Sequence, residues 1–228
     1  MKNLIRNVGL IALTVIMGTA LAKGPGPKPP PDPEPVNLFH VITVSEQNGD
    51  FKSPVEAIES ITDANETAPY VIKIGPGVYD IGSSQIVMKP WVTLQGSGKR
   101  STKITGANTE GDTSAIVIGA DNAVMTDLTI ENRGGGDYSY AISNNMASPT
   151  IKRVNAMAYD GYWSTIGILN NSSSPTMTFV SAAAYGNSNM STGIHIFNAS
   201  NPVMTHVNAK AVCSYAEAYG VSVFESSP

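Results

Sequence analysis

The stretch "NNSSSPTMTFV", residues 170–180, returns in altered form as "NNMASPTIKRV" at 144–154 and as "FNASNPVMTHV" at 197–207. Each copy places amide and small side chains before a proline and a short apolar run after it. The prolines at 149, 175, 202 and 228 are separated by 26, 27 and 26 residues. This regular spacing indicates a repeat protein, in which each unit must stack on its neighbours to bury its apolar face.

The repeat can be followed at three further positions, and each predicts a column of equivalent side chains. The first position holds aliphatic residues, the second holds small or aliphatic residues, and the third holds alanine or glycine before an aliphatic residue. The columns are Leu128, Val154, Val180 and Val207; Ile130, Ala156, Ala182 and Ala209; and Ala141, Gly167, Gly193 and Gly220.

These columns predict an all-β fold, a single-stranded right-handed parallel β-helix with coils of about 26 residues. The Ser, Thr, Asn and β-branched content argues against helical repeats, and the leucine ladder of leucine-rich repeats is missing. Coils of a parallel β-helix stack about 4.8 Å apart, so equivalent side chains can bond to one another. We therefore expect Asn145, Asn171 and Asn198 to form an amide ladder at a turn. A β-sandwich with coincidental spacing is the alternative.

Two segments precede this domain. Residues 1–22 combine Lys2 and Arg6 with an apolar run and end in "ALA", which predicts an export signal cleaved after Ala22. An uncleaved membrane anchor is the alternative, but the apolar run is shorter than the roughly 20 residues that a spanning helix needs. Residues 23–37 are rich in Pro and Gly and are expected to form an extended linker. The domain would then occupy residues 38–228.

Composition excludes several classes of protein. The 228-residue chain has a net charge of −4 and 14% charged residues, which is typical of a globular protein and offers no basic patch for nucleic acid. Cys213 is the single cysteine, so no disulfide can form within the chain, and we expect a small buried side chain there rather than a catalytic thiol. No spacing typical of metal ligands is present, and no cofactor is expected.

The first part of the domain predicts a helix that caps the solenoid. "FHVITV" at 39–44 alternates as a strand does, and the segment that follows contains Ser53, Pro54 and Glu56 in the order of a helix start. The helix is expected over about 53–64. Further strands are expected at 70–74, 86–88 and 92–96, with coils over about 70–228 and the last coil incomplete.

The order of these signals resembles the pectinesterase family of pectin-lyase-like β-helices. The similar segments are "ITVSEQNGDFKSPVEAIESI", "YVIKIGPGVYDI", "VTLQGSGKRSTKITG" and "AIVIGADNAVMTDLTIEN", within residues 41–132, and "YDGYWSTI" at 159–166 is faintly similar to a later family motif. The resemblance implies a strand, a capping helix and the first coils, and it implies a carboxylic ester hydrolase.

The catalytic residues that the resemblance implies are not matched. The family uses a nucleophilic Asp, a second Asp as acid/base, two Gln that stabilise the oxyanion and an Arg. This chain has Tyr138 and Trp163 where the two Gln are expected, and Ser164 where an Asp would follow. "GIHIFNAS" at 193–200 stands at the nucleophile motif and contains no carboxylate.

Other polysaccharide chemistries also lack their residues. From Ala141 onward the acids are Asp160, Glu217 and Glu225 and the bases are Lys152, Arg153 and Lys210, too few for a calcium-dependent lyase or a pair of carboxylates. Asp160 and His195 stay as candidate catalytic residues that could meet across coils. The alternatives are a turn-forming Asp160 and a structural His195, and His206 is also expected to be structural.

Aromatic residues gather between the post-proline strand and the next Ala or Gly of each repeat, which predicts one strip of rings along the solenoid. The strip comprises Tyr138, Tyr140, Tyr159, Tyr162, Trp163, Tyr185, Tyr215 and Tyr219. Aromatic faces beside amides and hydroxyls suit sugars, whose apolar faces cover the rings while the amides bond hydroxyl groups. The alternative is that these rings pack on each other.

These observations favour an exported, non-catalytic β-helix that acts as a carbohydrate-binding or adhesive surface in the extracellular space or periplasm. The alternative is an active pectinesterase or related esterase or lyase that modifies plant-type cell-wall pectin, through residues beyond Pro228 or through Asp160. A structural spacer or self-assembling surface protein is the third hypothesis. Polysaccharide is the expected partner. We expect neither nucleic-acid binding nor a membrane span after cleavage of the signal. Two alternatives stay for the last coil: self-association with another chain, or continuation of the β-helix.

Overall fold

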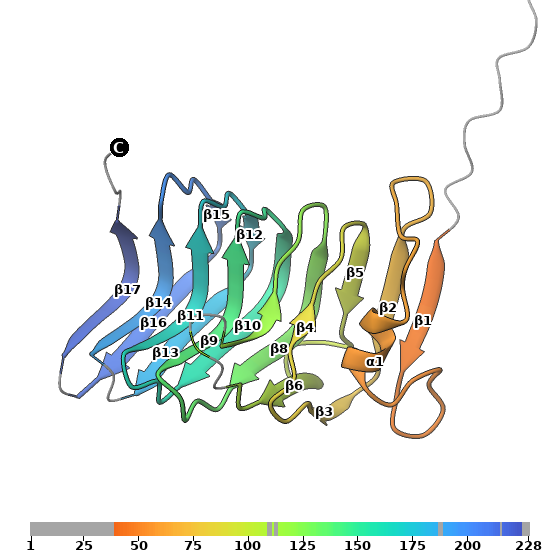
Figure 1. The fold of residues 1–228 in the computed structure, drawn as a ribbon, viewed down its shortest axis with the longest axis horizontal. Coiled ribbons are helices and arrows are strands. Elements are labelled where there is room, and N and C mark those ends of the chain that lie inside the picture. Colours follow the sequence, from red (N-terminus) through yellow and green to blue (C-terminus); the bar gives the residue numbers. More distant parts are fainter. Residues whose placement is uncertain (1–38, 109–110, 112–113, 187–188, 215, 225–228) are drawn as a thin grey trace, which may run out of the picture. The chain divides into compact units, whose positions relative to one another are not determined.

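The computed structural model describes residues 39–108, 111, 114–186, 189–214 and 216–224. The predicted signal segment and linker lie outside these residues. Within them the chain forms an all-β parallel solenoid, as predicted, of about seven turns with one short helix. Figure 1 shows the coils following one another from β1 and β2 on the right to β17 on the left.

Two sheets of parallel strands make the walls of the solenoid. The eleven-stranded sheet contains β1 (His40–Val44), β2 (Tyr70–Ile74), β3 (Gly77–Asp80), β5 (Val92–Gln95), β6 (Thr102–Gly106), β8 (Val124–Asn132), β10 (Thr150–Tyr159), β12 (Thr176–Thr178), β13 (Ser181–Gly186), β15 (Val203–Thr205) and β16 (Asn208–Cys213). The six-stranded sheet contains β4 (Ile86–Val87), β7 (Ala115–Ile118), β9 (Tyr138–Asn145), β11 (Ser164–Asn171), β14 (Met190–Phe197) and β17 (Glu217–Phe224).

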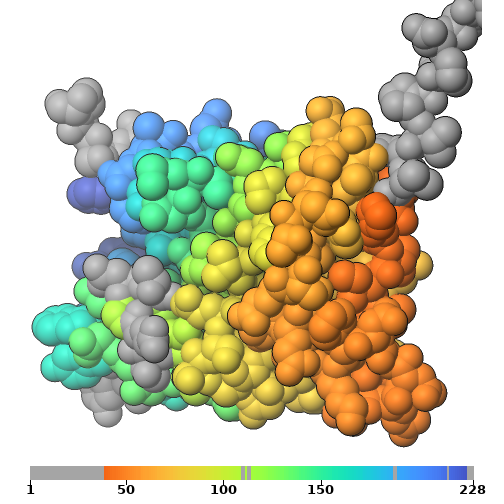
Figure 2. Space-filling model, turned by 45° about the vertical axis from the view of Figure 1, so that its right-hand side comes forward, coloured from red at the N-terminus to blue at the C-terminus, as the bar shows by residue number. Residues whose placement is uncertain are grey.

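Helix α1 (Pro54–Glu59) lies beside the first coils. It begins as predicted, because the Ser53 hydroxyl accepts a hydrogen bond from the Val55 amide at 3.2 Å and Pro54 occupies the first turn. It is shorter than the expected range. Lys89 lies near its C-terminal end, where the ammonium donates to the carbonyls of Glu59 and Ile61. Figure 2 shows the segment around α1, in orange, on the surface at this end of the solenoid.

The predicted columns are confirmed by the strand register. Ala156 pairs with Ile130 on one side and with Ala182 on the other, and Ala182 pairs with Ala209. Leu128, Val154 and Val180 are buried in the main core, and Val207 packs against it. The repeat therefore encodes the core, because one inward position per coil is filled by an apolar side chain directly over its equivalent.

The predicted asparagine ladder is also present. The Asn171 amide donates to the Asn145 side-chain oxygen at 2.8 Å, and the Asn198 amide donates to the Asn171 oxygen at 2.8 Å. A second ladder lies one position earlier, where Asn144 donates to Asn170 at 2.9 Å inside the core. These amides join successive coils at the turn before each proline, so the polar repeat has a structural role.

A corner column of left-handed residues bends the eleven-stranded sheet. Asp127, Arg153, Phe179 and His206 have φ between 52° and 60° and occupy equivalent positions in four coils. The Arg153 guanidinium forms two bonds with the Asp127 carboxylate, at 2.5 and 2.6 Å, and the Phe179 and His206 rings stack at 4.6 Å. Side-chain pairs thus stabilise a backbone conformation that is costly for such residues. The His206 ring is therefore part of this corner.

The ion pair at this corner should make stability depend on acidity. The hydrogen bonds from Arg153 lower the pKa of Asp127 in the folded protein. A depressed carboxyl pKa stabilises the fold above the unfolded pKa of about 3.9, and this contribution is lost as the pH falls through the folded pKa. We expect Asp127→Asn to lower the melting temperature at pH 7 and to differ little from the parent at pH 2. A constant difference between the two proteins across this range would contradict the assignment.

The last described coil differs from the others in exposure. Val221 and Val223 continue the columns of the buried Ile194 and Ile196, but they are exposed. That another segment or chain covers this surface stays a prediction. Cys213, in β16, is partly buried. No helix among the described residues has both the length and the apolar character needed to cross a membrane.

Candidate functional site

The outer face of the six-stranded sheet carries a hollow of about 560 Å³. Two columns of outward side chains form most of its lining, because equivalent residues of successive coils lie next to one another. One column contains Ile118, Ser143 and Leu169, and the second contains Asn145, Asn171 and Phe197. Gln85 and Tyr140 complete the lining. Hollows of this size are typical of sites for small molecules.

A small apolar cluster lies on the same outer face. Ala115, Tyr140 and Ile166 are buried there, and Ile118, Tyr138 and Leu169 are among the side chains that pack against them. Tyr140 is only 6% exposed, and its ring lies 6.0 Å from that of Tyr138. Two of the predicted sugar-binding tyrosines therefore belong to this cluster, although Tyr140 also reaches the hollow.

The most exposed predicted aromatics lie at the corner before β11. Tyr162 and Trp163 are 65% and 51% exposed, and their rings meet edge to face at 5.0 Å. Their backbone amides donate to the carbonyls of Gly136 and Asp137 in the preceding coil, which fixes this loop on the solenoid. An aromatic pair held on an ordered loop offers open ring faces to a ligand.

Tyr159 and Tyr185 lie on the eleven-stranded sheet instead, so the aromatics do not form one strip. Their rings stack at 5.4 Å with an interplanar angle of 19°, and the Lys210 ammonium lies 5.4 Å from the centre of the Tyr185 ring. Burial is the main reason that the pKa of Tyr159 is raised. Both faces of Tyr185 are covered, which favours packing over sugar contact at this ring. Tyr219 is 39% exposed, and Tyr215 lies outside the described residues.

Asp160 and His195 are not brought together. His195 pairs with Leu169 in the strand register, whereas Asp160 precedes Ser164, the first residue of β11. Five residue steps separate Ser164 from Leu169 and span roughly 16 Å of strand, so the two candidates lie at opposite ends of β11. Asp160 has φ of 47° and is exposed, as a turn residue would be.

His195 is a partly buried, uncharged group at neutral pH. Burial lowers the pKa of its imidazole, and its ring lies 5.2 Å from that of Phe197. The Nδ1 atom is buried without a hydrogen-bond partner among the described residues. The neutral form is favoured because no neighbouring carboxylate compensates the cost of burying the charged ring.

Ser164 occupies a position where the sequence resemblance would place a carboxylate. It is 5% exposed, and its hydroxyl has no hydrogen-bond partner among the described residues. Its neighbours along the column are Tyr138 and Met190, neither of which can accept a proton as a base at neutral pH. A serine hydroxyl becomes a nucleophile only beside such a base, and these two neighbours do not supply one.

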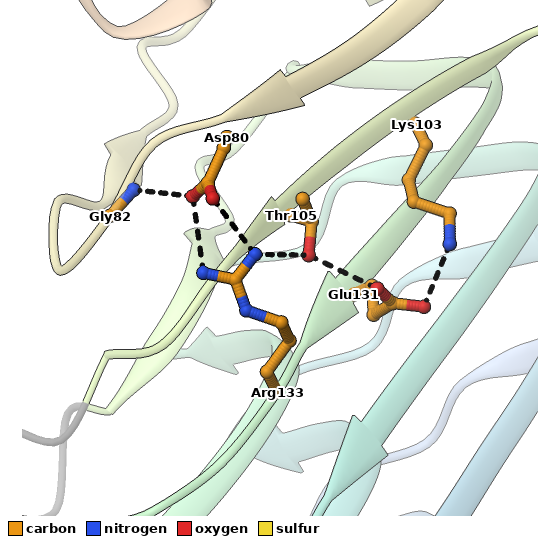
Figure 3. Close-up of polar contacts among 6 residues, drawn as sticks. All are labelled: Asp80, Gly82, Lys103, Thr105, Glu131 and Arg133. Atoms are coloured by element: carbon orange, nitrogen blue, oxygen red, sulfur yellow. Dashed lines mark hydrogen bonds and ion pairs between the residues drawn. The ribbon is translucent and has the colours of Figure 1, made fainter.

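A polar network crosses the outer face of β3, β6 and β8 (Figure 3). Arg133 donates to both oxygens of Asp80, at 2.9 and 3.2 Å, and Lys103 pairs with Glu131 at 3.0 Å. Thr105 lies between the two pairs and donates to Glu131. The Arg133 guanidinium lowers the pKa of Asp80. Because each carboxylate has its own cation, this network joins coils and lacks the free acid/base pair that glycoside hydrolysis requires.

No described residues form a group of three or more His, Cys, Asp or Glu side chains that could hold a metal ion. The candidate site thus consists of the hollow and of the exposed pair Tyr162 and Trp163. Sequence reasoning identified the aromatic pair but missed Gln85, Ile118 and Leu169. Those three lie in different coils and carry no shared motif. Ile118 and Leu169 could be found from their outward positions in β7 and β11, whereas Gln85 precedes β4.

The sequence comparisons agree on one family. The sequence pattern that defines the family "Pectinesterase" matches residues 40–172. A probable pectinesterase/pectinesterase inhibitor from Arabidopsis thaliana is 31% identical over 112 residues, which are 45% of this chain and 19% of that protein. A pectinesterase from Daucus carota is 26% identical over 129 residues, which are 53% of this chain and 40% of that protein. The chain thus spans less than half the length of these relatives.

Solved structures resemble the solenoid at low sequence identity. Pectin methylesterase PemA from Erwinia chrysanthemi has a TM-score of 0.47 and 16% identity, covering 70% of this chain and 55% of that one. Pectin methylesterase from carrot has a TM-score of 0.47 and 20% identity, covering 70% of this chain and 50% of that one.

Proposed function

The chain belongs to the pectinesterase family, and from this premise we propose that it recognises pectin-type polysaccharide on the outer face of its six-stranded sheet. The observation that carries the proposal is the exposed pair Tyr162 and Trp163, held on a loop that leads directly into β11. Aromatic faces cover the apolar side of a sugar ring, and the amide ladder at the far end of β11 offers partners for hydroxyl groups of other units of the polymer. Binding to a polysaccharide of the cell wall also agrees with the predicted export signal, so we propose that the chain acts outside the cytoplasm.

Removal of Trp163 tests this proposal. We expect Trp163→Ala to weaken retention of the purified chain on immobilised methyl-esterified pectin by roughly 2- to 10-fold, since an aromatic contact is worth about 0.5–1.5 kcal/mol beyond its buried area. The matched control is Phe179→Ala, because Phe179 is 48% exposed but lies at the other corner, against His206. Equal retention of the parent and Trp163→Ala would show that the aromatic pair does not contact the polysaccharide.

Hydrolysis of pectin methyl esters is the second candidate function, and membership of the family favours it. The chemistry needs an attacking group, a proton acceptor and donors for the oxyanion. The column neighbours of Ser164 supply no base, and the Asp160 carboxylate lies far from His195. Binding without hydrolysis is therefore our first proposal.

Methanol release from the same pectin separates the two functions. If the parent chain releases no methanol above the rate of buffer alone while it is retained on the gel, binding is its function. Enzymatic release of methanol would establish hydrolysis. Loss of that release in Asp160→Ala, with retention unchanged, would identify Asp160 as part of the catalytic site.

A further inference from the structure

The last described coil exposes side chains that are buried in every coil before it. Val221 of β17 lies in register with the fully buried Ile194 but is 44% exposed. Met204 of β15 likewise lies in register with the buried Met177 but is 41% exposed. Exposed apolar surfaces of this kind mark sites of protein contact. We propose that a second copy of this chain covers this surface, with the last coils of the two copies packed against each other around a twofold axis.

The backbone of this coil is also open on one side. β15, β16 and β17 pair with β12, β13 and β14 of the preceding coil, and no described strand pairs with their other edge (Figure 1). A strand edge with free N–H and C=O groups pairs readily with the edge of another chain. A twofold axis perpendicular to the solenoid brings two such edges together as antiparallel strands. The resulting dimer is closed, because each copy uses its open edge on the other.

The charges on these strands favour one arrangement of the two copies. Lys210 on β16 and Glu217 at the start of β17 are the charged residues of the three strands, and both are exposed. Their register partners in the preceding coil are Ala183 and Met190, so neither meets an opposite charge there. β17 begins shortly after β16 ends, at the same corner of the coil. If β17 of each copy pairs with β16 of the other, Lys210 therefore lies within reach of Glu217 of the second copy, and this ion pair forms twice.

Two other arrangements fit this end less well. Pairing of β16 with β16 would bring the two Lys210 side chains together, and like charges on adjacent strands are destabilising. In a head-to-tail stack, the first coil of another copy would meet β17. No strand between β1 and β2 belongs to the six-stranded sheet, and α1 lies there with Ala57 and Ile58 in the core. β17 would then have no partner, whereas two last coils offer β16, of six residues, and β17, of eight, strands of similar length.

Sedimentation equilibrium of the purified chain at several concentrations tests the contact. We expect a monomer–dimer equilibrium without larger species. Val221→Lys should raise the dissociation constant of the dimer at least roughly tenfold, because it places an unpaired charge in the apolar centre of the contact. Val87→Lys is the matched control and should keep the parent's dissociation constant, since Val87 is 54% exposed on β4, at the far end of the same sheet. A monomer at every concentration, open-ended assembly, or a dimer that Val221→Lys does not weaken would overturn the inference.

Charge reversal tests the pairing of β16 with β17. Lys210→Glu and Glu217→Lys should each raise the dissociation constant by roughly 5- to 30-fold, because two attractive pairs become two repulsive ones.

The double variant Lys210→Glu/Glu217→Lys separates the contact between copies from contacts within one chain. Like the single variants, it loses the contact of Lys210 with the Tyr185 ring and the hydrogen bond of Glu217 with the Tyr219 hydroxyl. We expect it to restore dimerisation, because the ion pairs between copies return with their charges exchanged. Single variants that dimerise as the parent does, or a double variant as weak as the singles, would overturn the arrangement. If circular dichroism shows Val221→Lys to be unfolded, these variants carry the test, since they change exposed side chains.

Discussion

Gly167→Val is expected to destabilise the protein by about 3 kcal/mol, at the upper end of what overpacking usually costs. A Cβ atom at Gly167 would lie 2.6 Å from the Gly193 carbonyl oxygen and 2.8 Å from the Ala183 amide nitrogen. Both neighbours are backbone atoms of adjoining strands, so no side-chain movement relieves the contact. The measurement is the free energy of unfolding in urea, compared with the parent.

The same column supplies the control for Gly167. Ala141 occupies the equivalent position one coil earlier and is fully buried, so a Cβ atom is accommodated there. We expect Ala141→Gly to cost only about 0.5–1 kcal/mol, from the added freedom of the unfolded backbone. A loss of stability in Gly167→Val no larger than in Ala141→Gly would mean that the two sheets do not approach each other as closely as described.

Ile168→Ala is expected to cost about 2–5 kcal/mol, and Ile168→Val about 0.5–1.5 kcal/mol. Ile168 is fully buried and lies in register between Ile142 and Ile194. Removal of its outer carbon atoms leaves a cavity that the rigid stack of coils above and below cannot fill, because each neighbour is fixed by its own backbone bonds. Urea unfolding of the three proteins provides the comparison. Equal stability of the parent and Ile168→Ala would place this side chain outside the core.

Much of the fold could be predicted because a stacked repeat places its core in fixed sequence positions. The columns through Ala156 and Val154 and the ladder from Asn145 to Asn198 follow directly from the spacing of the prolines. The corner at Asp127 and Arg153 could not be predicted. A left-handed backbone usually selects Gly or Asn, whereas here ion pairing and ring stacking stabilise it in residues with no turn signature.

The candidate site was harder to predict than the fold. The sequence shows that the aromatic residues lie near the ends of strands, but it does not show which sheet each one joins. Tyr159 is the last residue of β10 in the eleven-stranded sheet, whereas Trp163 directly precedes β11 in the six-stranded sheet. The hollow escaped prediction for another reason. The side chains in its columns alternate between apolar and polar from coil to coil, as Ser143 lies between Ile118 and Leu169. No single sequence motif therefore identifies the hollow.

The two sheets differ in the side chains on their outer faces, and the proposed site follows from this difference. The polar network of Asp80, Arg133, Lys103 and Glu131 neutralises its own charges on the eleven-stranded sheet. The outer face of the six-stranded sheet instead combines an apolar floor, open amides and exposed rings. This difference is the reason that we place the proposed recognition of the polymer on the six-stranded sheet.

Methyl NMR during titration with esterified hexagalacturonate tests the central claim most directly. Ile118 and Leu169 line the hollow, whereas Val78 is exposed on β3 of the other sheet. The account predicts that the methyl signals of Ile118 and Leu169 shift progressively to saturation while those of Val78 stay in place. Unmoved signals from Ile118 and Leu169 at a saturating concentration of the hexamer, or shifts confined to Val78, would contradict it.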